Sequence, residues 1–184
     1  MKNSQKIAEF AQLGDSVLRQ QAKYVDDVNS ACILRIIDAM SMALSGSNGV
    51  GLAAPQISES VRIVIIASRP SKRYPLAPEM EPVVMINPEY DVISQDKKKD
   101  WEGCLSIPGI RALVPRYEKI RINYFDQQGS QQELLAEDFV ARIFQHEYDH
   151  LNGLVYLDRV EDNKDIISET EFQKLMELNN PSDM

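Results

Sequence analysis

Apolar side chains recur at helical spacing after Asn29-Ser30, and this pattern predicts a helix with one buried stripe that ends at Gly46. Cys32 falls within the stripe, so we interpret it as a small buried side chain and not as a ligand. A weaker pattern near the end of the chain predicts a last helix over 162–178 or 168–178. The chain is therefore expected to carry a helix towards each end.

Dense β-branched residues and period-two alternation predict strands in the middle of the chain. These strands are expected over 62–67, 83–86, 90–93, 111–114, 119–125 and 132–136. Asn87-Pro88 is expected to break the ladder between the second and the third of them. Residues 68–82 contain four prolines and are expected to form a surface loop. The basic run 97–99, flanked by Asp96 and Asp100, is interpreted as a solvated loop.

A further helix is predicted over about 138–151, and polar residues lie on the face that should be buried. Phe139, Ile143, His146 and His150 share that face. We therefore predict an α+β fold, in which mixed or antiparallel sheets pack around this central helix between an N-terminal and a C-terminal helix.

The length and the charge of the chain narrow its class. The 184 residues can bury a core of their own, so we expect a single domain over 1–184. The net charge of −8 argues against a specific nucleic-acid partner or an anionic membrane surface, because both require a basic face. No apolar run of about 18 residues predicts a membrane span, and no apolar signal segment opens the chain. We therefore expect a cytoplasmic protein.

The motif His146-Glu147-Tyr148-Asp149-His150 contains both histidines of the chain. Residues four apart lie on one face of a helix, so both imidazoles can reach a single metal ion. Glu147 is then placed to touch a water molecule held by that ion.

A catalytic metal site usually has three protein ligands and one open position. The chain has no third histidine, so the candidates are Cys104, Cys32, or a downstream carboxylate, Glu169 or Glu171. Cys104 is favoured, because its neighbour Gly103 lets another backbone approach and because a thiolate accepts ferrous iron as well as zinc.

Three segments, in this order, resemble the motifs of the peptide deformylase family. They are Gly49-Val50-Gly51-Leu52-Ala53-Ala54-Pro55-Gln56, Glu102-Gly103-Cys104-Leu105-Ser106 and Gln145-His146-Glu147-Tyr148-Asp149-His150. The likeness extends from about Gly14 to Asp158. The resemblance implies a metal-dependent hydrolase that removes the formyl group from the N-terminal methionine of nascent polypeptides and releases formate.

The resemblance also implies a role for each motif residue. The metal ligands are expected to be Cys104, His146 and His150, holding one divalent ion per chain, with Fe²⁺ as the native ion and Zn²⁺, Ni²⁺ or Co²⁺ as alternatives. Glu147 is expected to act as general base and general acid. The side-chain amide of Gln56 and the backbone N–H of Leu105 are expected to stabilise the oxyanion.

By the same resemblance, the formyl-methionyl peptide lies extended and pairs as an added strand. The residues expected to contact it are Gly49, Val50, Gly51, Gly103, Phe139, Arg142 and Ile143. The stem of Arg142 is expected to line the methionine pocket while its guanidinium reaches water. Glu102 and Gln145 are expected to orient the ligands without binding the metal. For Asp149 two expectations stay open: a pair with Arg111 or Arg116, or a solvated acid on the helix.

Two alternatives stay open from the sequence. One is a zinc peptidase of the His-Glu-x-x-His type that uses Glu169 or Glu171 as its third ligand. The other is a non-catalytic, metal-stabilised paralogue that binds formyl peptides. A deformylase that acts on nascent chains is expected to come transiently near the ribosome, but segment 158–184 has eight acidic and three basic residues. A basic tail contact with ribosomal RNA is therefore not expected.

Overall fold

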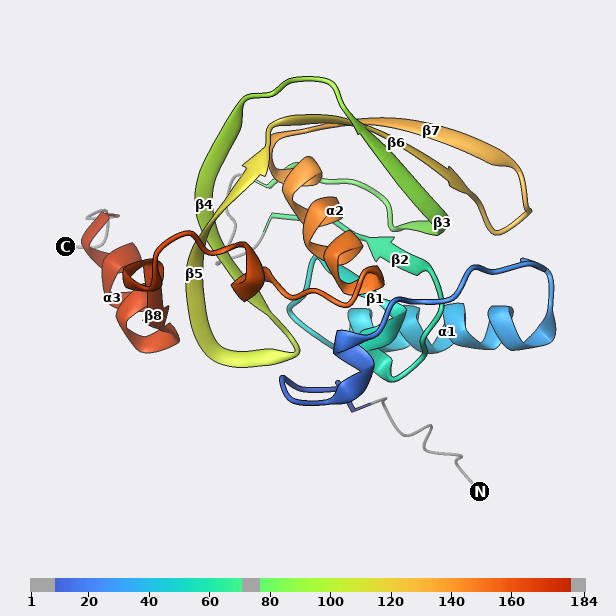
Figure 1. Ribbon diagram of the computed structural model, residues 1–184, viewed down its shortest axis with the longest axis horizontal. Coiled ribbons are helices and arrows are strands. Elements are labelled where there is room, and N and C mark those ends of the chain that lie inside the picture. Colours follow the sequence, from blue (N-terminus) through green and yellow to red (C-terminus); the bar gives the residue numbers. More distant parts are fainter. Residues whose placement is uncertain (1–8, 71–76, 180–184) are drawn as a thin grey trace.

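The computed structural model describes residues 9–70 and 77–179, and it shows an α+β fold with two antiparallel sheets (Figure 1). The five-stranded sheet has the order β1 (Gly51–Ala53), β2 (Ile63–Ile66), β3 (Val83–Val92), β6 (Lys119–Phe125) and β7 (Gln131–Glu137). The three-stranded sheet has the order β4 (Lys97–Cys104), β5 (Ile107–Tyr117) and β8 (Ile166–Ser168). The helices are α1 (Ala31–Ser45), α2 (Asp138–Leu151) and α3 (Glu169–Asn179). The predictions of an α+β fold with antiparallel sheets and of a helix near each end are confirmed.

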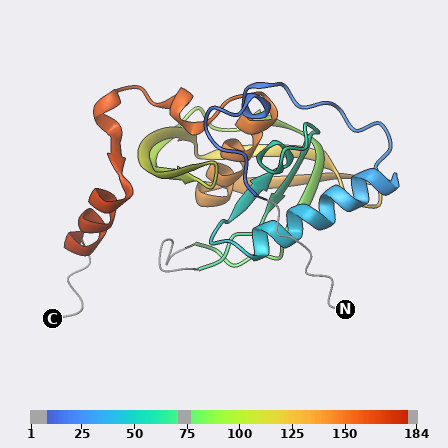
Figure 2. The ribbon, with the colours of Figure 1, turned by 90° about the horizontal axis from the view of Figure 1, so that it is seen from below.

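The two longer helices cover opposite faces of the five-stranded sheet. On β2, Ile63 and Ile65 pack into the cluster that contains α1, whereas Val64 and Ile66 pack into the cluster that contains α2. This two-sided burial explains why β2 is a continuous apolar run instead of an alternating one. Figure 2 shows α1 lying along one face of this sheet. Helix α2 also contacts β5, so it lies between the two sheets.

Helix α1 begins after Ser30, whose hydroxyl accepts a hydrogen bond from the N–H of Ile33, and it ends at Gly46 as expected. The prediction that Cys32 is buried is wrong, because its side chain is exposed. Cys32 lies in the first turn, at the edge of the stripe formed by Ile33 and the buried residues that follow it. The apolar periodicity therefore predicted the buried face of α1 correctly, but it wrongly included Cys32 in that face.

Two segments that were predicted not to be strands, the break at Asn87-Pro88 and the loop at 97–99, lie within strands of the structure. Asn87 and Pro88 lie inside β3, where the register shifts between Ile86 and Glu89. A bulge tolerates a proline, and the Asn87 side chain bonds the backbone N–H and C=O of Val25, each at 2.9 Å. Residues 97–99 begin β4 at the edge of its sheet; their exposed lysines suit an edge that must not pair further. Of the predicted loop over 68–82, residues 71–76 lie outside the described residues.

None of the helices in the described part of the chain has the length and apolarity that a bilayer span requires.

Gly153, just after α2, has a positive φ of 71°, and a Cβ there would lie 2.9 Å from the backbone C and O of Arg19. We expect Gly153→Ala to lower the free energy of unfolding by about 2–4 kcal/mol, because backbone strain and a clash with main chain add. Gly109→Ala is the matched control, since φ is 79° there and no atom lies within 4 Å of the added carbon. It should cost about 1–2 kcal/mol. Urea denaturation checks both values, and equal costs would mean that the clash with Arg19 is relieved.

Candidate metal centre and active site

One atom each of Cys104, His146 and His150 lies within 4.8 Å of the others, and all three side chains are at least partly buried. Cys104 is the last residue of β4, and the histidines are one turn apart on α2. The Cys104 Sγ lies 3.3 Å from the Nε2 of His150. Ligand bonds of roughly 2.0–2.3 Å are compatible with one cation between these atoms.

The candidates for a third ligand differ in their surroundings. Cys32 is exposed on α1, away from the histidines. The Glu169 carboxylate accepts a hydrogen bond from the Arg111 Nε at 2.6 Å, and Glu171 pairs with Lys174 at 2.7 Å. Within the described residues, Cys104 is the group that completes a cluster with both histidines.

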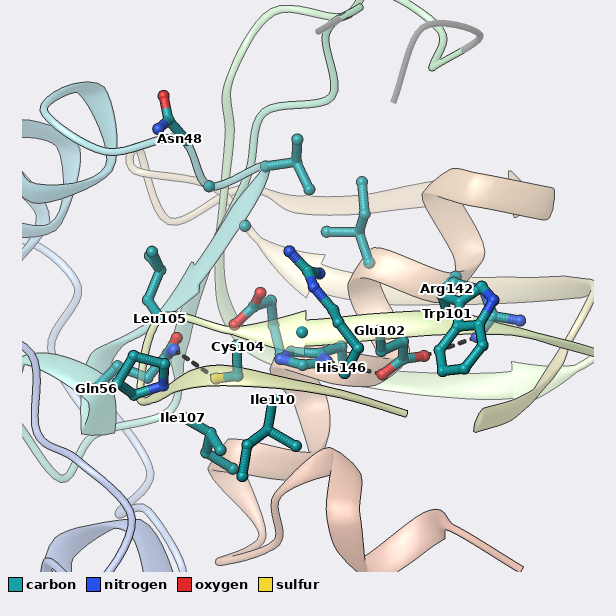
Figure 3. Close-up of a pocket in the computed structure, with 18 of the residues that line it drawn as sticks. Asn48, Gln56, Trp101, Glu102, Cys104, Leu105, Ile107, Ile110, Arg142 and His146 are labelled. Atoms are coloured by element: carbon teal, nitrogen blue, oxygen red, sulfur yellow. Dashed lines mark hydrogen bonds and ion pairs between the residues drawn. The ribbon is translucent and has the colours of Figure 1, made fainter. Parts of the chain in front are cut away.

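Glu102 orients His146 from the side opposite the cluster. The Nδ1 of His146 donates to the Glu102 carboxylate at 2.8 Å, which leaves Nε2 for a cation (Figure 3). Arg116 donates two further hydrogen bonds to the same carboxylate, at 2.9 and 3.0 Å. Burial by itself would raise the pKa of Glu102. The Arg116 guanidinium and the hydrogen bond from His146 outweigh burial and hold that pKa well below its usual range.

The charges in the cluster favour a cation between the ligands. Burial raises the pKa of the Cys104 thiol, but His150 and His146 outweigh burial and hold that pKa well below its usual value. Burial lowers the pKa of His146, but Cys104 and Glu102 outweigh it and hold the pKa well above its usual value. The donor set therefore stabilises positive charge at this point, and a divalent ion fits it.

Glu147 lies beside the three ligand side chains, buried on α2. Burial raises the pKa of its carboxyl to about 7, against the opposing effect of His146 and His150. Its Oε2 has no hydrogen-bond partner among the described residues. A buried carboxylate with a spare oxygen is suited to hold a water molecule and to exchange a proton with it.

Gln56 reaches the cluster from the short helix η2 (Ala54–Ile57). Its Oε1 accepts a hydrogen bond from the N–H of Ala53 at 2.8 Å, and this bond fixes the amide. The Nε2 then donates to the Cys104 Sγ at 3.4 Å (Figure 3). It also donates to the Ser106 hydroxyl at 3.4 Å. Leu105, next to Cys104, lines the same cavity. The expected roles of Gln56 and Leu105 as oxyanion donors stay predictions.

The centre opens into a cleft of about 290 Å³. All seven residues predicted to contact the substrate line it: Gly49, Val50, Gly51, Gly103, Phe139, Arg142 and Ile143. Trp101, Ile110 and Arg111 line it too, although they were not expected there from the sequence. Trp101 comes directly before the second motif, and this position could have predicted it. Glu169 also lines the cleft, although the sequence suggested it only as an alternative metal ligand.

Strand β8 and helix α3 bring Glu169 to the cleft. Strand β8 pairs with residues 110–112 of β5, and α3 follows it directly. Phe172 of α3 is buried against the ring of Trp101, at a centroid distance of 5.6 Å, and under the Arg111 guanidinium, at 5.1 Å. The Arg111 guanidinium lies across Gly103, where a Cβ would collide with it. Gly103 therefore makes room for an arginine side chain instead of another backbone.

The expectation for Arg142 is wrong in one respect. Its stem lines the cleft, but its guanidinium does not reach water; the residue is only 8% exposed. The Nη1 donates to Glu102 and to the Val114 carbonyl, both at 2.8 Å, and the Nη2 donates to the Lys98 carbonyl at 2.6 Å. Fixed acceptors inside the protein replace water for this cation.

Asp149 and Gln145 lie next to the two histidines in the sequence of α2, and both bond residues of other elements. Asp149 pairs with Arg116 at 2.6 Å, one of the two partners expected, and also with Arg159 at 2.7 Å. Gln145 bonds both the N–H and the C=O of Tyr117, at 3.0 and 2.9 Å. These bonds fasten α2 to β5, so Gln145 acts on the helix and not directly on a ligand.

A thiolate and two imidazoles around one cation position, with a buried carboxylate beside them, are typical of metal-dependent hydrolases. The family model described as polypeptide deformylase matches residues 7–165, and the chain belongs to this family.

Curated and solved relatives agree. The chain is 50% identical to "Peptide deformylase 2" of a Nostoc species over 94% of this chain and 97% of the relative, and 40% identical to "Peptide deformylase 2" of Ralstonia nicotianae over 85% and 88%. A class I type b peptide deformylase of Acinetobacter baumannii, solved with Met-Ala-Ser bound, aligns with a TM-score of 0.81 at 41% identity, over 84% of this chain and 99% of that one. A peptide deformylase of Synechococcus elongatus in complex with actinonin aligns with a TM-score of 0.77 at 36% identity, over 90% and 85%.

Gly51 is the point at which β1 approaches the Glu147 carboxylate, which we expect to be catalytic. A Cβ there would lie 2.5 Å from the Glu147 Oε1 and 2.8 Å from the Cγ2 of Ile143. We expect Gly51→Ala to lower the hydrolytic kcat/KM by about 10²-fold, because misplacing a catalytic group by about 1 Å has an effect of that size. Gly14→Ala is the control, since Gly14 does not line the cleft and no atom lies within 4 Å of the added carbon. Steady-state kinetics on both variants checks this, and equal losses would contradict the assignment of Gly51.

Proposed function

We propose that this chain hydrolyses the N-formyl group of the N-terminal methionine of nascent polypeptides and releases formate and a free amine. The observation that carries the proposal is the meeting of Cys104 with His146 and His150 beside Glu147, in a chain of the polypeptide deformylase family. The relative bound to Met-Ala-Ser supports it, because that tripeptide has the form of a deformylated product.

In this proposal α2 is the metal-binding helix at the centre of one catalytic domain over 1–184, and Cys104, His146 and His150 hold one divalent ion. When bound, the ion lowers the pKa of a water molecule beside it and polarises the formyl carbonyl. Fe²⁺ is the ion we expect in the cell, and Zn²⁺, Ni²⁺ and Co²⁺ suit the same ligands. Because its proposed substrates are nascent chains, we expect the protein to act in the cytoplasm near ribosomes. We do not expect its acidic segment 158–184 to dock on ribosomal RNA.

The chain's own groups handle the proton and the developing charge. Glu147 takes a proton from the attacking water and passes it to the departing amine. The Gln56 Nε2, held by the bond between its Oε1 and Ala53, and the backbone N–H of Leu105 donate to the oxygen that becomes negative. Both donors are expected to be set before substrate binds, which is what makes such donors effective.

The peptide is expected to bind as an added strand along β1. This strand is the first in its sheet, so its outer edge is available for pairing. The methionine side chain then enters the part of the cleft lined by Val50, Phe139 and Ile143. An apolar wall of this kind suits an unbranched thioether.

Two alternatives lose support from the geometry. A peptidase with Glu169 or Glu171 as third ligand requires a carboxylate that is instead paired with Arg111 or with Lys174. A paralogue that only binds formyl peptides leaves the buried, partly unbonded carboxylate of Glu147 without a purpose.

Glu147→Gln should keep the metal and lower kcat/KM by about 10²–10⁴-fold, because the amide cannot exchange the proton. The measurement is formate release from formyl-Met-Ala-Ser, beside metal analysis of the same sample. Retained turnover with full metal content would refute the role of Glu147.

Cys104→Ser should lose its metal to a chelator that leaves the wild type loaded, because a hydroxyl is a far weaker ligand than a thiolate. Metal analysis after dialysis under anaerobic conditions tests this. Cys32→Ser is the control, since this exposed residue lies outside the cluster. If the Cys104 variant held its metal as firmly as this control, the ligand set would be wrong.

A further inference from the structure

We propose that Arg142 is a positioning residue for the metal centre, a clamp that holds Glu102 and helix α2 in the arrangement His146 requires. The proposal rests on the proposed function, since it assigns a role within that metal centre. Arg142 lies four residues before His146 on α2, so both side chains leave the same face of the helix.

The guanidinium bonds two strands at once. Its Nη2 donates to the carbonyl of Lys98 on β4 at 2.6 Å, and its Nη1 donates to the carbonyl of Val114 on β5 at 2.8 Å. A carbonyl cannot turn without its strand, so these bonds fix the distance from α2 to the sheet that carries Cys104. A planar, five-donor group can satisfy such divergent acceptors together, whereas an ammonium cannot hold the same geometry.

The same Nη1 donates to the Oε1 of Glu102 at 2.8 Å. Arg116 bonds both oxygens of this carboxylate, but Arg116 belongs to β5 and is shared with Asp149. Arg116 therefore links Glu102 to β5 and, through Asp149, to the part of α2 that follows His146. Arg142 is the residue that links Glu102 directly to the turn of α2 before His146. Without the Arg142 guanidinium, the Glu102 carboxylate keeps its bonds to Arg116 and His146 but loses this anchor to the preceding turn.

A purely structural arginine would affect stability alone, so the test compares Arg142 with one. Arg62 is equally buried, at 7% exposed, and donates to Glu89 at 2.8 Å and to the Pro88 carbonyl at 3.2 Å. Its described contacts include neither a metal ligand nor Glu102. Arg142→Met keeps most of the apolar stem without the guanidinium, and Arg62→Met makes the same change at the control position.

The experiment measures the affinity of each variant for Zn²⁺, by competition with a chromophoric chelator, and the urea midpoint of the metal-free protein. Arg142→Met should bind the metal about 10–100-fold more weakly, which is typical when a group that orients a ligand is lost. Arg62→Met should lower the midpoint while its metal affinity stays within about 3-fold of the wild type. Arg142→Lys should restore part of the affinity, since it keeps the charge and a single donor nitrogen in place of three.

Metal affinity of Arg142→Met within about 3-fold of the wild type, with a midpoint lowered as in Arg62→Met, would overturn the proposal. If Arg142→Met does not fold, Arg142→Lys decides, because an affinity equal to the wild type would then also overturn it. The chelator assay uses no substrate. Absence of formate release by the wild-type protein would therefore count against the proposed function without changing what the metal affinities say about Arg142.

Discussion

The carboxylate of Glu102 is the point on which the rest of the site depends. It is buried, and it receives hydrogen bonds from Arg116, from Arg142 and from the Nδ1 of His146. A buried carboxylate with a missing partner is costly, whereas one that is fully bonded is rigid. Because its donors come from β5 and α2 and the residue itself belongs to β4, this one group ties together the three elements that build the centre.

Helix α2 can bury so many polar residues because most of them have partners on other elements; the Oε2 of Glu147 is an exception among the described residues. Gln145 bonds the backbone of Tyr117, and Asp149 bonds Arg116 and Arg159. Buried ion pairs of this kind add little net stability, since desolvation offsets most of their attraction. What they contribute is a single docked position for α2, because any slip of the helix leaves several charges without partners. Apolar packing of Phe144 and Leu151 on the five-stranded sheet supplies the stabilisation itself.

Much of this arrangement follows from local sequence signals. Helix α2 occupies the predicted range 138–151, because a helix is defined by neighbours in sequence. Clusters whose residues come from several elements are harder to predict from the sequence. The course of Arg142 into the protein depends on acceptors 28 to 44 residues away in sequence, and the contribution of Glu169 to the cleft depends on β8 pairing with β5. The basic run at 97–99 is likewise a strand because of its partner β5, not because of its own composition.

A peptide-binding metal site must combine a rigid set of ligands with an edge that remains open, and the fold assigns these demands to different sheets. The ligand Cys104 and the arginine clamp belong with the three-stranded sheet, whereas the open edge is β1 of the five-stranded sheet. Helix α2 serves both, since Arg142 and His146 face β4 and β5 while Ile143 and Glu147 lie against Gly51 of β1. Under the proposed function, a peptide that pairs with β1 would meet Glu147 directly, and it would reach the expected ligands without disturbing the bonds that hold them. Separating the two demands in this way would let substrates of varied sequence share one fixed geometry of catalysis.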